Sequence, residues 1–462
     1  MKRAAVGALA LLVGCAAGPD YRRPAIVVPE SYRDVAAAPA GASIADAGWW
    51  NVYGDPRLVA LIETALHNNP DLRAAVARID EARAALGEAR LALLPTIAAR
   101  GTVVRSKASV DALAPGAPRI RNVEEAAVTV AYELDLWGRL RRSNEAARAT
   151  LLGTEYARHT VAAALIANVA TAYFTLMSLD AQLEVTKRTV GTREKFVELT
   201  RAQHDRGYAT GLDVATAEAQ AAVARANVPD LERRIATTEN QICLLLGENP
   251  HSIEREHRGE VVPAAPPAPP AGLPSELLER RPDVRAAEEA LRAANANVGV
   301  ARAALFPTIS LTGLAGSLSS PLGALFKAPT AEWSVAANLV QPLLDPQRSL
   351  YQVELADARK REVLAEYEQA VRTAFRETAD SLVAFGKYGE LAREQANQVA
   401  ALRRAEDIAL ARYRVGYASY FDVINADRDL FAAELALNQA YLNSLTSFVL
   451  LYQTLGGGWQ AR

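Results

Sequence analysis

"PDVRAAEEALRAANANVGVARAALFPTI", residues 282–309, decides the fold because a close copy of it occurs earlier in the chain. The earlier copy is "PDLRAAVARIDEARAALGEARLALLPTI", residues 70–97, and the two are identical at 15 of 28 positions without a gap. The correspondence continues where "RGYATGLDV" from Arg206 aligns with "VGYASYFDV" from Val415. The chain is therefore one unit present twice, and two copies are too few for a solenoid.

The duplication gives the chain a simple domain plan. A proline-rich connector, "VVPAAPPAPPAGLP" at 261–274, joins the copies and is too stiff for a helix. We expect a signal peptide at 1–14, a first structural repeat at 15–260 and a second at 275–462. Each repeat should contain a helix, two strands, a long helix, a turn and a last helix. The long helices should span about 140–206 and 347–414, since no proline interrupts either range.

Composition excludes several classes of protein. The 462 residues are 50% hydrophobic and 23% charged, which is not the composition of a disordered chain. Aromatic residues make up only 6%, a mix that suits long, closely packed helices. A formal net charge of -2 gives no electrostatic reason to expect nucleic acid as a partner.

The N-terminus is typical of a secretory signal. Lys2 and Arg3 precede an apolar run, residues 4–13, that is too short to span a membrane. "LVGC" resembles a bacterial lipobox, in which Cys15 becomes the lipidated first residue, and Ala16 after it implies sorting to the outer membrane. Cleavage leaves 49 basic and 53 acidic residues, a net charge of -4. The other cysteine, Cys243, is predicted to be a small buried hydrophobe.

One stretch has the length of a transmembrane helix. Residues 160–179, "TVAAALIANVATAYFTLMSL", carry no charge. Their counterpart in the second copy, "AVRTAFRETADSLVAF" at 370–385, carries four charges. Because a true membrane span should not have a charged twin, we interpret the stretch as the buried seam of a helix bundle.

Alternating side chains predict membrane strands between each copied segment and each long helix. In "VTVAYELDL", 128–136, apolar residues from Val128 to Leu136 share one face and polar ones the other, as in a membrane barrel. "WSVAANLVQPL" from Trp333 is a second candidate, and "TIAARGTVVRS" and "TISLTGLAGSLSS" are weaker ones. A soluble hairpin with one wet face has the same periodicity, but the lipobox favours the membrane.

The number of strands predicts an oligomer. Four strands per chain cannot enclose a lumen, and lipid cannot satisfy the free backbone groups of an open sheet. Several chains must then share one barrel, and three chains give twelve strands above a ring of helices.

The sequence resembles the TolC-like outer-membrane factors, in particular the lipoprotein branch that serves resistance-nodulation-division efflux systems. The resemblance rests on "GCAAGPDYRRP", "GWWNVYGDPRLVALIETALHNNPDL", "YELDLWGRLRR", "LPSELLERRPDVRAAEEALRAANANVGVARAALFPTISLTG" and "RYRVGYASYFDVINADRDL". It implies a mixed α/β membrane protein: a homotrimer with a twelve-stranded outer-membrane β-barrel continuous with a periplasmic α-helical coiled-coil barrel. It also implies passive export of small molecules, driven by an inner-membrane transporter and joined through a periplasmic adaptor protein.

The resemblance also implies a gate at the periplasmic end. Asp422 matches an acidic ring, Asn425 stands where many relatives have a second aspartate, and Phe421 is a candidate apolar constriction. Asp213 and Tyr413 match positions that link neighbouring helices in the shut gate. The relatives' arginine falls on Ala418, which leaves Arg412 or Arg414 as substitutes. The helix tips that face the adaptor are Arg206, Gly207, Tyr208, Val415, Gly416 and Tyr417.

Enzyme chemistry finds no motif in this sequence. Five histidines lack zinc-site spacing, and no phosphate-binding loop or nucleophile elbow occurs, so we expect no cofactor or metal. Two other readings remain open: a lipid-anchored coiled-coil scaffold without a pore, and an outer-membrane conduit for type I protein secretion. The sequence does not identify the exported substrate or the pump.

Overall fold

The structure is a computed structural model, and it describes residues 16–29, 32, 55–109, 111, 116, 118–255, 276–341 and 346–457. The predicted signal peptide at 1–14, Cys15 and the connector at 261–274 lie outside the described residues.

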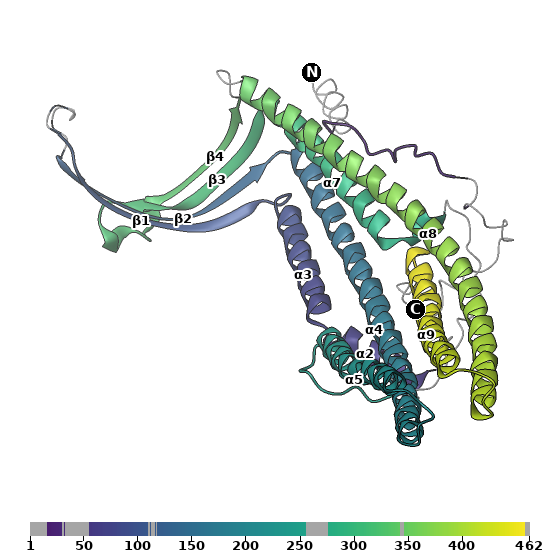
Figure 1. Cartoon of the computed structure of the whole chain (residues 1–462). Coiled ribbons are helices and arrows are strands. Elements are labelled where there is room, and N and C mark those ends of the chain that lie inside the picture. The colour runs from purple at the N-terminus through teal and green to yellow at the C-terminus, as the bar shows by residue number, and fades with distance from the viewer. Residues whose placement is uncertain are drawn as a thin grey trace. The chain divides into compact units, whose positions relative to one another are not determined.

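Both copies contain the predicted order of elements (Figure 1). The first copy supplies α2 (Pro56–Asn68), α3 (Pro70–Leu91), β1 (Thr96–Lys107), β2 (Ile120–Glu133), α4 (Arg139–Asp205) and α5 (Gly211–Leu246). The second copy supplies α6 (Leu277–Arg280), α7 (Pro282–Ala303), β3 (Thr308–Ser319), β4 (Ala331–Val340), α8 (Pro346–Arg414) and α9 (Tyr420–Thr454). Two short 3-10 turns, Leu322–Ala324 and Ala328–Thr330, lie between β3 and β4. The long helices match the predicted ranges to within one residue.

Two compact units divide the chain, and each takes pieces from both copies. The first comprises Met1–Ala25, Arg78–Glu155 and Ala286–Glu368. The second comprises Ile26–Ala77, Tyr156–Arg285 and Gln369–Arg462. The compact units therefore do not coincide with the sequence repeats, and each unit needs both copies to form.

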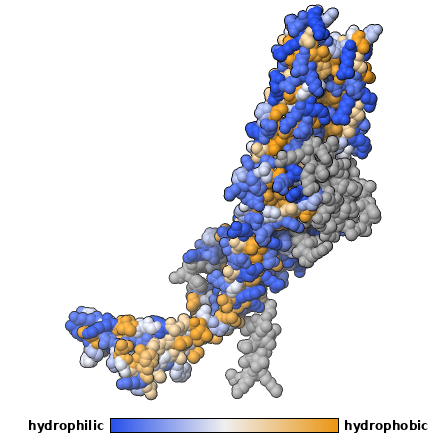
Figure 2. Space-filling view, turned by 90° about the horizontal axis from the view of Figure 1, so that it is seen from below, coloured by the Kyte–Doolittle hydropathy of each residue, from blue (hydrophilic) through white to orange (hydrophobic). Residues whose placement is uncertain are grey.

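The first unit holds an antiparallel sheet in the order β1-β2-β3-β4, with one polar and one apolar face. Two rows across the sheet make the apolar face: Ala99, Val128, Ala315 and Trp333 in one, and Ile97, Val130, Gly313 and Val335 in the other. On the opposite face, Arg100 lies 3.8 Å from the carboxylate of Glu125. Figure 2 shows apolar side chains gathered along the strands. In these two rows, all four strands turn apolar or small side chains to the face of Val128 and Val130.

The strands differ from the sequence prediction in two respects. β2 ends at Glu133, short of Leu136, because the chain turns into α4 through Gly138, whose φ is 78°. The two weaker candidates form strands of 12 residues each, β1 and β3. Small and charged residues give β1 and β3 little strand signal of their own, and pairing with β2 supplies what the local sequence lacks.

The core of the second unit contains the uncharged stretch of α4. By length and composition alone α4 could cross a membrane. Within this unit, however, Val169, Ala170 and Leu176 are fully buried in a cluster with Leu58 of α2 and Leu445 of α9. This packing agrees with the prediction that the uncharged stretch is the buried seam of a helix bundle. Cys243 is also buried, as predicted, but its Sγ lies 3.3 Å from Nδ1 of His251 rather than in a purely apolar site.

The C-terminal ends of α5 and α9 are fastened in the same way. Asn69, just before α3, donates from Nδ2 to the carbonyl of Leu245 at 2.9 Å. Arg281, the equivalent residue before α7, donates to the carbonyl of Thr454 at 3.4 Å. The duplication therefore preserved a contact between the start of one helix and the end of another, although the side chain that makes it changed.

Candidate functional site

The two helical hairpins of the second unit, α4–α5 and α8–α9, end in turns of one geometry. Gly207 and Gly416 have φ of 79° and 81°, a left-handed conformation that glycine adopts without strain. The N–H of Tyr208 donates to the carbonyl of Gln203 at 2.8 Å, and the N–H of Tyr417 donates to that of Arg412 at 2.8 Å. This bond closes the last helical turn as in a Schellman motif. The turns expected from the sequence are present in both hairpins.

The next helix of each hairpin begins with the same capping box. At α5, Thr210 Oγ1 accepts from the N–H of Asp213 at 3.2 Å, and the Asp213 carboxylate accepts from the N–H of Thr210 at 2.8 Å. At α9, Ser419 and Asp422 make the same two bonds at 3.3 and 2.9 Å. Both aspartates therefore stabilise the start of their own helices.

These hydrogen bonds set the charge of the two aspartates. Donors on Ser419 hold the pKa of Asp422 below its usual value, and the positive charge of Arg412 acts in the same direction. Thr210 lowers the pKa of Asp213 likewise. In the acidic ring that the resemblance implies, mutual repulsion among three Asp422 carboxylates would raise this pKa. Within one chain the cap acts in the opposite direction, so a ring of Asp422 starts from a lowered pKa.

Tyr413 joins the two hairpins near their turns. Its hydroxyl donates to Oε1 of Gln203 in α4 at 2.6 Å. Burial raises the pKa of Tyr413, which keeps the hydroxyl protonated and able to donate. The ring of Tyr420 lies 5.8 Å from that of Tyr413 and 6.1 Å from that of Phe196 in α4. The partner of Tyr413 within the chain is thus Gln203, which no motif marked, and not Asp213.

The turns present apolar side chains to solvent within the chain. Tyr208 is 83% exposed and Tyr417 is 78% exposed, and Val415, between Arg414 and Gly416, is also exposed. Phe421 is 67% exposed at the start of α9, Asn425 one turn later is half-buried, and Arg206 is exposed. Exposed aromatic and aliphatic side chains at a rigid turn are typical of a surface that contacts another protein.

A buried carboxylate ties α9 to both long helices. Glu434 of α9, whose side chain is 8% exposed, accepts from Arg188 of α4 at 2.6 Å and from Arg403 of α8 at 2.7 Å. One carboxylate therefore holds three helices, and both guanidinium groups remain partly in solvent. The sequence offered no signal for this contact, because Glu434 lies in an ordinary helical stretch.

A second buried pair brings in α5. Arg193 of α4 donates to Asp427 of α9 at 2.7 Å and to the carbonyl of Gln220 of α5 at 3.0 Å. Its guanidinium also lies 5.3 Å from the ring centre of Phe431. Burial raises the pKa of Asp427, and the charge of Arg193 opposes that effect. The four helices are thus linked in the order α5, α4, α9, α8.

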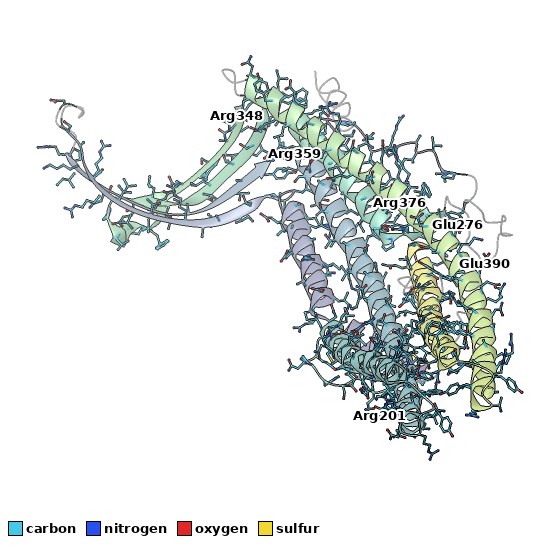
Figure 3. The ribbon with its side chains drawn as sticks, viewed as in Figure 1. Arg201, Glu276, Arg348, Arg359, Arg376 and Glu390 are labelled. Carbon is cyan, nitrogen blue, oxygen red and sulfur yellow. The ribbon has the colours of Figure 1, made fainter. Side chains whose placement is uncertain are left out.

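Exposed ion pairs add to these links along the hairpins. Arg201 of α4, labelled in Figure 3, donates to Glu218 of α5 at 2.6 Å. Arg225 of α5 donates to Glu194 of α4 at 3.2 Å. Both pairs are about half exposed, so each contributes little to stability.

A cavity of about 410 Å³ lies beside the buried carboxylate. Arg188 and Thr192 line it from α4, Arg403 and Glu406 from α8, and Glu434 from α9. Burial, and then the charges of Asp427, Asp407 and Glu434, raise the pKa of Glu406. Charged side chains from α4, α8 and α9 thus surround the cavity, together with the apolar Leu430 and Phe431 of α9.

No group of three or more metal-binding side chains occurs among the residues that the structure describes. His251 contacts Cys243 and, at 3.0 Å, Glu248, which is a local contact at the end of α5. The chemistry of the second unit is therefore that of helix caps, ion pairs and exposed turns.

Comparison with known proteins agrees with this architecture. A family model described as "Outer membrane efflux protein" matches residues 61–248 and 273–457, once for each copy. The toluene efflux pump outer membrane protein TtgC and the antibiotic efflux pump outer membrane protein ArpC, both of Pseudomonas putida, are each 37% identical over 97% of this chain and 94% of their own. The solved outer-membrane channel OprN is similar with a TM-score of 0.90 and 32% identity, over 97% of this chain and 100% of that one.

Proposed function

Because this chain belongs to the outer membrane efflux protein family, we propose that it is the outer-membrane exit channel of a tripartite pump. It passively carries small toxic compounds to the exterior. A transporter of the resistance-nodulation-division class in the inner membrane supplies the energy, and a periplasmic adaptor protein joins the two. The family membership confirms the resemblance to the TolC-like outer-membrane factors and the prediction that the chain is not an enzyme.

The sheet of the first unit carries this proposal. One face is apolar and the other polar, which suits lipid on one side and a wet lumen on the other. Within the described residues, β1 and β4 each pair on one side only. Lipid cannot satisfy those free edges, so β4 of one chain must pair with β1 of the next. Three chains give a closed barrel of twelve strands.

Purified protein in planar bilayers tests the channel. We expect step-like conductance, and native mass spectrometry in detergent should give a trimer. A lipid-anchored scaffold would give neither conductance nor protected strands. A conduit for protein secretion would conduct as well, but deletion of its gene would abolish export of a protein and leave drug and solvent tolerance unchanged.

The substrate class follows from the relatives. One is named for toluene and another for antibiotics, so the same architecture serves apolar solvents and larger drugs. We propose small apolar or amphipathic toxic compounds as cargo of this chain. Growth of a deletion strain with toluene and with a panel of antibiotics tests this assignment, and a strain as tolerant as its parent to both would contradict it.

The hairpin turns are proposed as the gate and as the contact for the adaptor. The gate comprises Asp422, Phe421, Asn425, Tyr413 and Asp213, and the adaptor contacts comprise Arg206, Gly207, Tyr208, Val415, Gly416 and Tyr417. Three Asp422 carboxylates around one lumen favour cations. Asp422→Ala should make permeation less cation-selective in a reversal-potential measurement, and Glu218→Ala, which removes a carboxylate from an exposed ion pair outside the proposed gate, is the control. Equal selectivity in Asp422→Ala and wild type would place the constriction elsewhere, with Phe421 the first alternative.

Membrane attachment is proposed to begin at Cys15. After removal of residues 1–14, acyl chains on this cysteine hold the mature N-terminus in the membrane. Mass spectrometry of the N-terminal peptide should show the acyl mass, and Cys15→Ser should remove it and leave an unprocessed or poorly sorted precursor. A free, unmodified Cys15 in the wild type would refute this assignment without affecting the channel.

A further inference from the structure

The segment that follows Cys15 lies along α7 in the first unit. The Pro19 carbonyl accepts from Nδ2 of Asn295 at 2.9 Å. The Tyr21 hydroxyl donates to Glu288 at 3.2 Å, and Arg23 donates to the same carboxylate at 3.0 Å. The segment therefore runs opposite to the helix. It corresponds to "GPDYRRP", a motif of the resemblance to which neither the channel nor the gate gives a role.

Two glycines bring the segment and the helix into backbone contact. A Cβ on Gly18, whose φ is 97°, would lie 2.4 Å from the Cα of Gly299. A Cβ on Gly299 would lie 2.8 Å from the side chain of Arg142 and 2.9 Å from the carbonyl of Ala17. No larger residue fits at either position without moving backbone. The close approach of the two backbones thus requires glycine at both positions.

Charge fixes the other end of the segment. Glu288 is only 1% exposed and also accepts from Arg292 at 3.0 Å, while Arg292 lies 4.9 Å from the ring centre of Tyr21. Burial alone would raise the pKa of Glu288, but the hydrogen bonds from Arg23 and Arg292 outweigh it and lower the pKa to about 2. The carboxylate is therefore ionised at any physiological pH and holds the segment through charge-assisted bonds.

The beginning of the segment contacts the junction between the sheet and the helices. The N–H of Ala17 donates to the carbonyl of Trp137 at 2.8 Å, and Asp20 pairs with Arg142 of α4 at 2.8 Å. Trp137 follows the end of β2, and its Nε1 donates at 2.8 Å to the carbonyl of Pro307, just before β3. The residue after Cys15 is thus one position from a contact at the root of the membrane strands.

The first copy shows that packing of the helix does not require this segment. Gly87 of α3 is the repeat equivalent of Gly299, and a Cβ there would meet nothing within 4 Å. Val76, the equivalent of Glu288, is 43% exposed in the chain. A glycine at this position is therefore shared by both helices, whereas in the part of the chain that the structure describes the segment is seated on α7 and not on α3.

We propose that the segment Ala16–Arg23 is a seating strap that fixes the acylated N-terminus at the root of the strands. An unattached leader of eight residues would let its first residue move over roughly 15 Å. With the strap seated on α4 and α7, the acyl chains begin within about one residue length, roughly 4 Å, of Ala16. The strap thereby sets the depth of the sheet in the membrane. This inference rests on the proposed acylation of Cys15.

Adjacent arginines provide a matched test. Arg23 binds Glu288, whereas the described residues offer Arg22 no hydrogen bond or ion pair. In acylated trimers purified in detergent, each cleavage rate after Tyr21 is divided by the rate for a free peptide of the same sequence, because both arginines flank the bond that chymotrypsin cuts. We expect Arg23→Ala to raise this ratio by about ten-fold or more, and Arg22→Ala to leave it unchanged. Gly18→Ala, which lies outside every helix and strand, should have the same effect as Arg23→Ala.

Membrane depth is the second measurement. A fluorophore on β4, placed at Leu339→Cys in a Cys243→Ser background, reports depth through quenching by lipids brominated at known positions. Strap release should shift that depth and reduce the yield of heat-stable outer-membrane trimers, while the N-terminal peptide keeps its acyl mass. Equal cleavage ratios in all variants, or a released strap with unchanged depth and trimer yield, would overturn the proposal. A wild-type chain that conducts but carries no acyl group would overturn it and leave the channel function intact.

Discussion

The hairpins α4–α5 and α8–α9 have the same turn but different second helices. The turn glycines share a left-handed conformation, and the two capping boxes make the same pair of hydrogen bonds. Beyond the turns, Glu434 of α9 pairs with both α4 and α8, whereas Glu218 and Arg225 of α5 each pair with α4 alone. Duplication thus preserved the backbone chemistry that makes a turn, while the number of neighbouring helices determined what each side chain does.

One pair of equivalent positions makes the difference concrete. Arg225 of α5 and Glu434 of α9 are 209 residues apart, the offset of the repeat. Arg225 makes an exposed ion pair with Glu194, and Glu434 makes a buried double ion pair. One turn on, Pro229 is tolerated within α5, but its equivalent in α9 is the buried Asn438, which donates to the Glu434 carbonyl at 3.2 Å. At this pair of positions, burial requires satisfied polar groups in α9 but not in α5.

The largest expected effect is at the buried carboxylate. Glu434→Ala leaves Arg188 and Arg403 without their shared partner and should destabilise the α8–α9 hairpin by about 2 to 3 kcal/mol. Arg225→Ala, at the equivalent position, should cost less than about 1 kcal/mol. Thermal unfolding of purified trimers measures both. Equal costs would mean that burial of Glu434 contributes nothing to the difference between the hairpins.

Substituting either turn glycine should destabilise the protein less than Glu434→Ala does, and by the same amount in both turns. Gly207→Ala and Gly416→Ala each place a Cβ in a left-handed conformation, at about 1 to 2 kcal/mol. Neither Cβ would meet another atom within 4 Å, so the cost is purely conformational. Asparagine at the same positions should recover part of it, because asparagine tolerates this conformation. Thermal unfolding again provides the measurement, and a marked difference between the copies would show that one turn contacts another chain.

Removing the hydrogen bond that links the two hairpins should destabilise the protein still less. Tyr413→Phe removes its bond to Gln203, at about 0.5 to 1.5 kcal/mol per chain. Three chains together could shift a closed pore towards the open state. The double variant Tyr413→Phe with Asp422→Ala should raise single-channel conductance and sensitise cells to large antibiotics. Gln203→Ala should reproduce the effect of Tyr413→Phe. An intact trimer with unchanged conductance in both would exclude this bond from the gate.

Lowering the pH should affect the stability of the two capping boxes differently only if the chains form a ring. Because hydrogen bonds lower the folded pKa of Asp213 and Asp422, their stabilisation is present above the ordinary value of 3.8 and is lost as pH falls through the lowered pKa. In a single chain both helix starts should fray together. Repulsion in a trimer raises the pKa of Asp422, so α9 should fray at a higher pH than α5. Hydrogen exchange of residues 210–216 and 419–425 at each pH compares them directly.

Features with a local cause could be predicted from the sequence. The absence of proline and the repeat together located the long helices, and glycine followed by a capping pair located both turns. Alternation predicts the second half of β2 and β4, whereas β1 and β3 have weaker patterns because much of what stabilises them comes from the strands beside them. The gate residues came from resemblance, since Asp422 by its local sequence is only a helix cap.

Contacts between distant elements could not be predicted in the same way. Glu434 meets Arg188 across 246 residues, and Gln203 meets Tyr413 across 210. Each of these side chains lies in a stretch that reads as an ordinary helix surface. The contact of Arg23 with the buried Glu288 is another such case, because the sequence does not show whether a glutamate is buried or exposed.

The pairing of β2 with β3 has a consequence for the rate of assembly. It is the seam between the two copies, and in the proposed trimer β4 meets the next chain's β1 in a seam of the same kind. Three of the six seams therefore form within single chains, where the effective concentration of one strand for the other is roughly millimolar. Two encounters between separate molecules then join the three chains, and the third seam closes within the assembled trimer. The rate of barrel closure then depends on only a low power of the concentration of newly exported chains, which is small. An unpaired strand edge therefore spends less time exposed to incorrect partners.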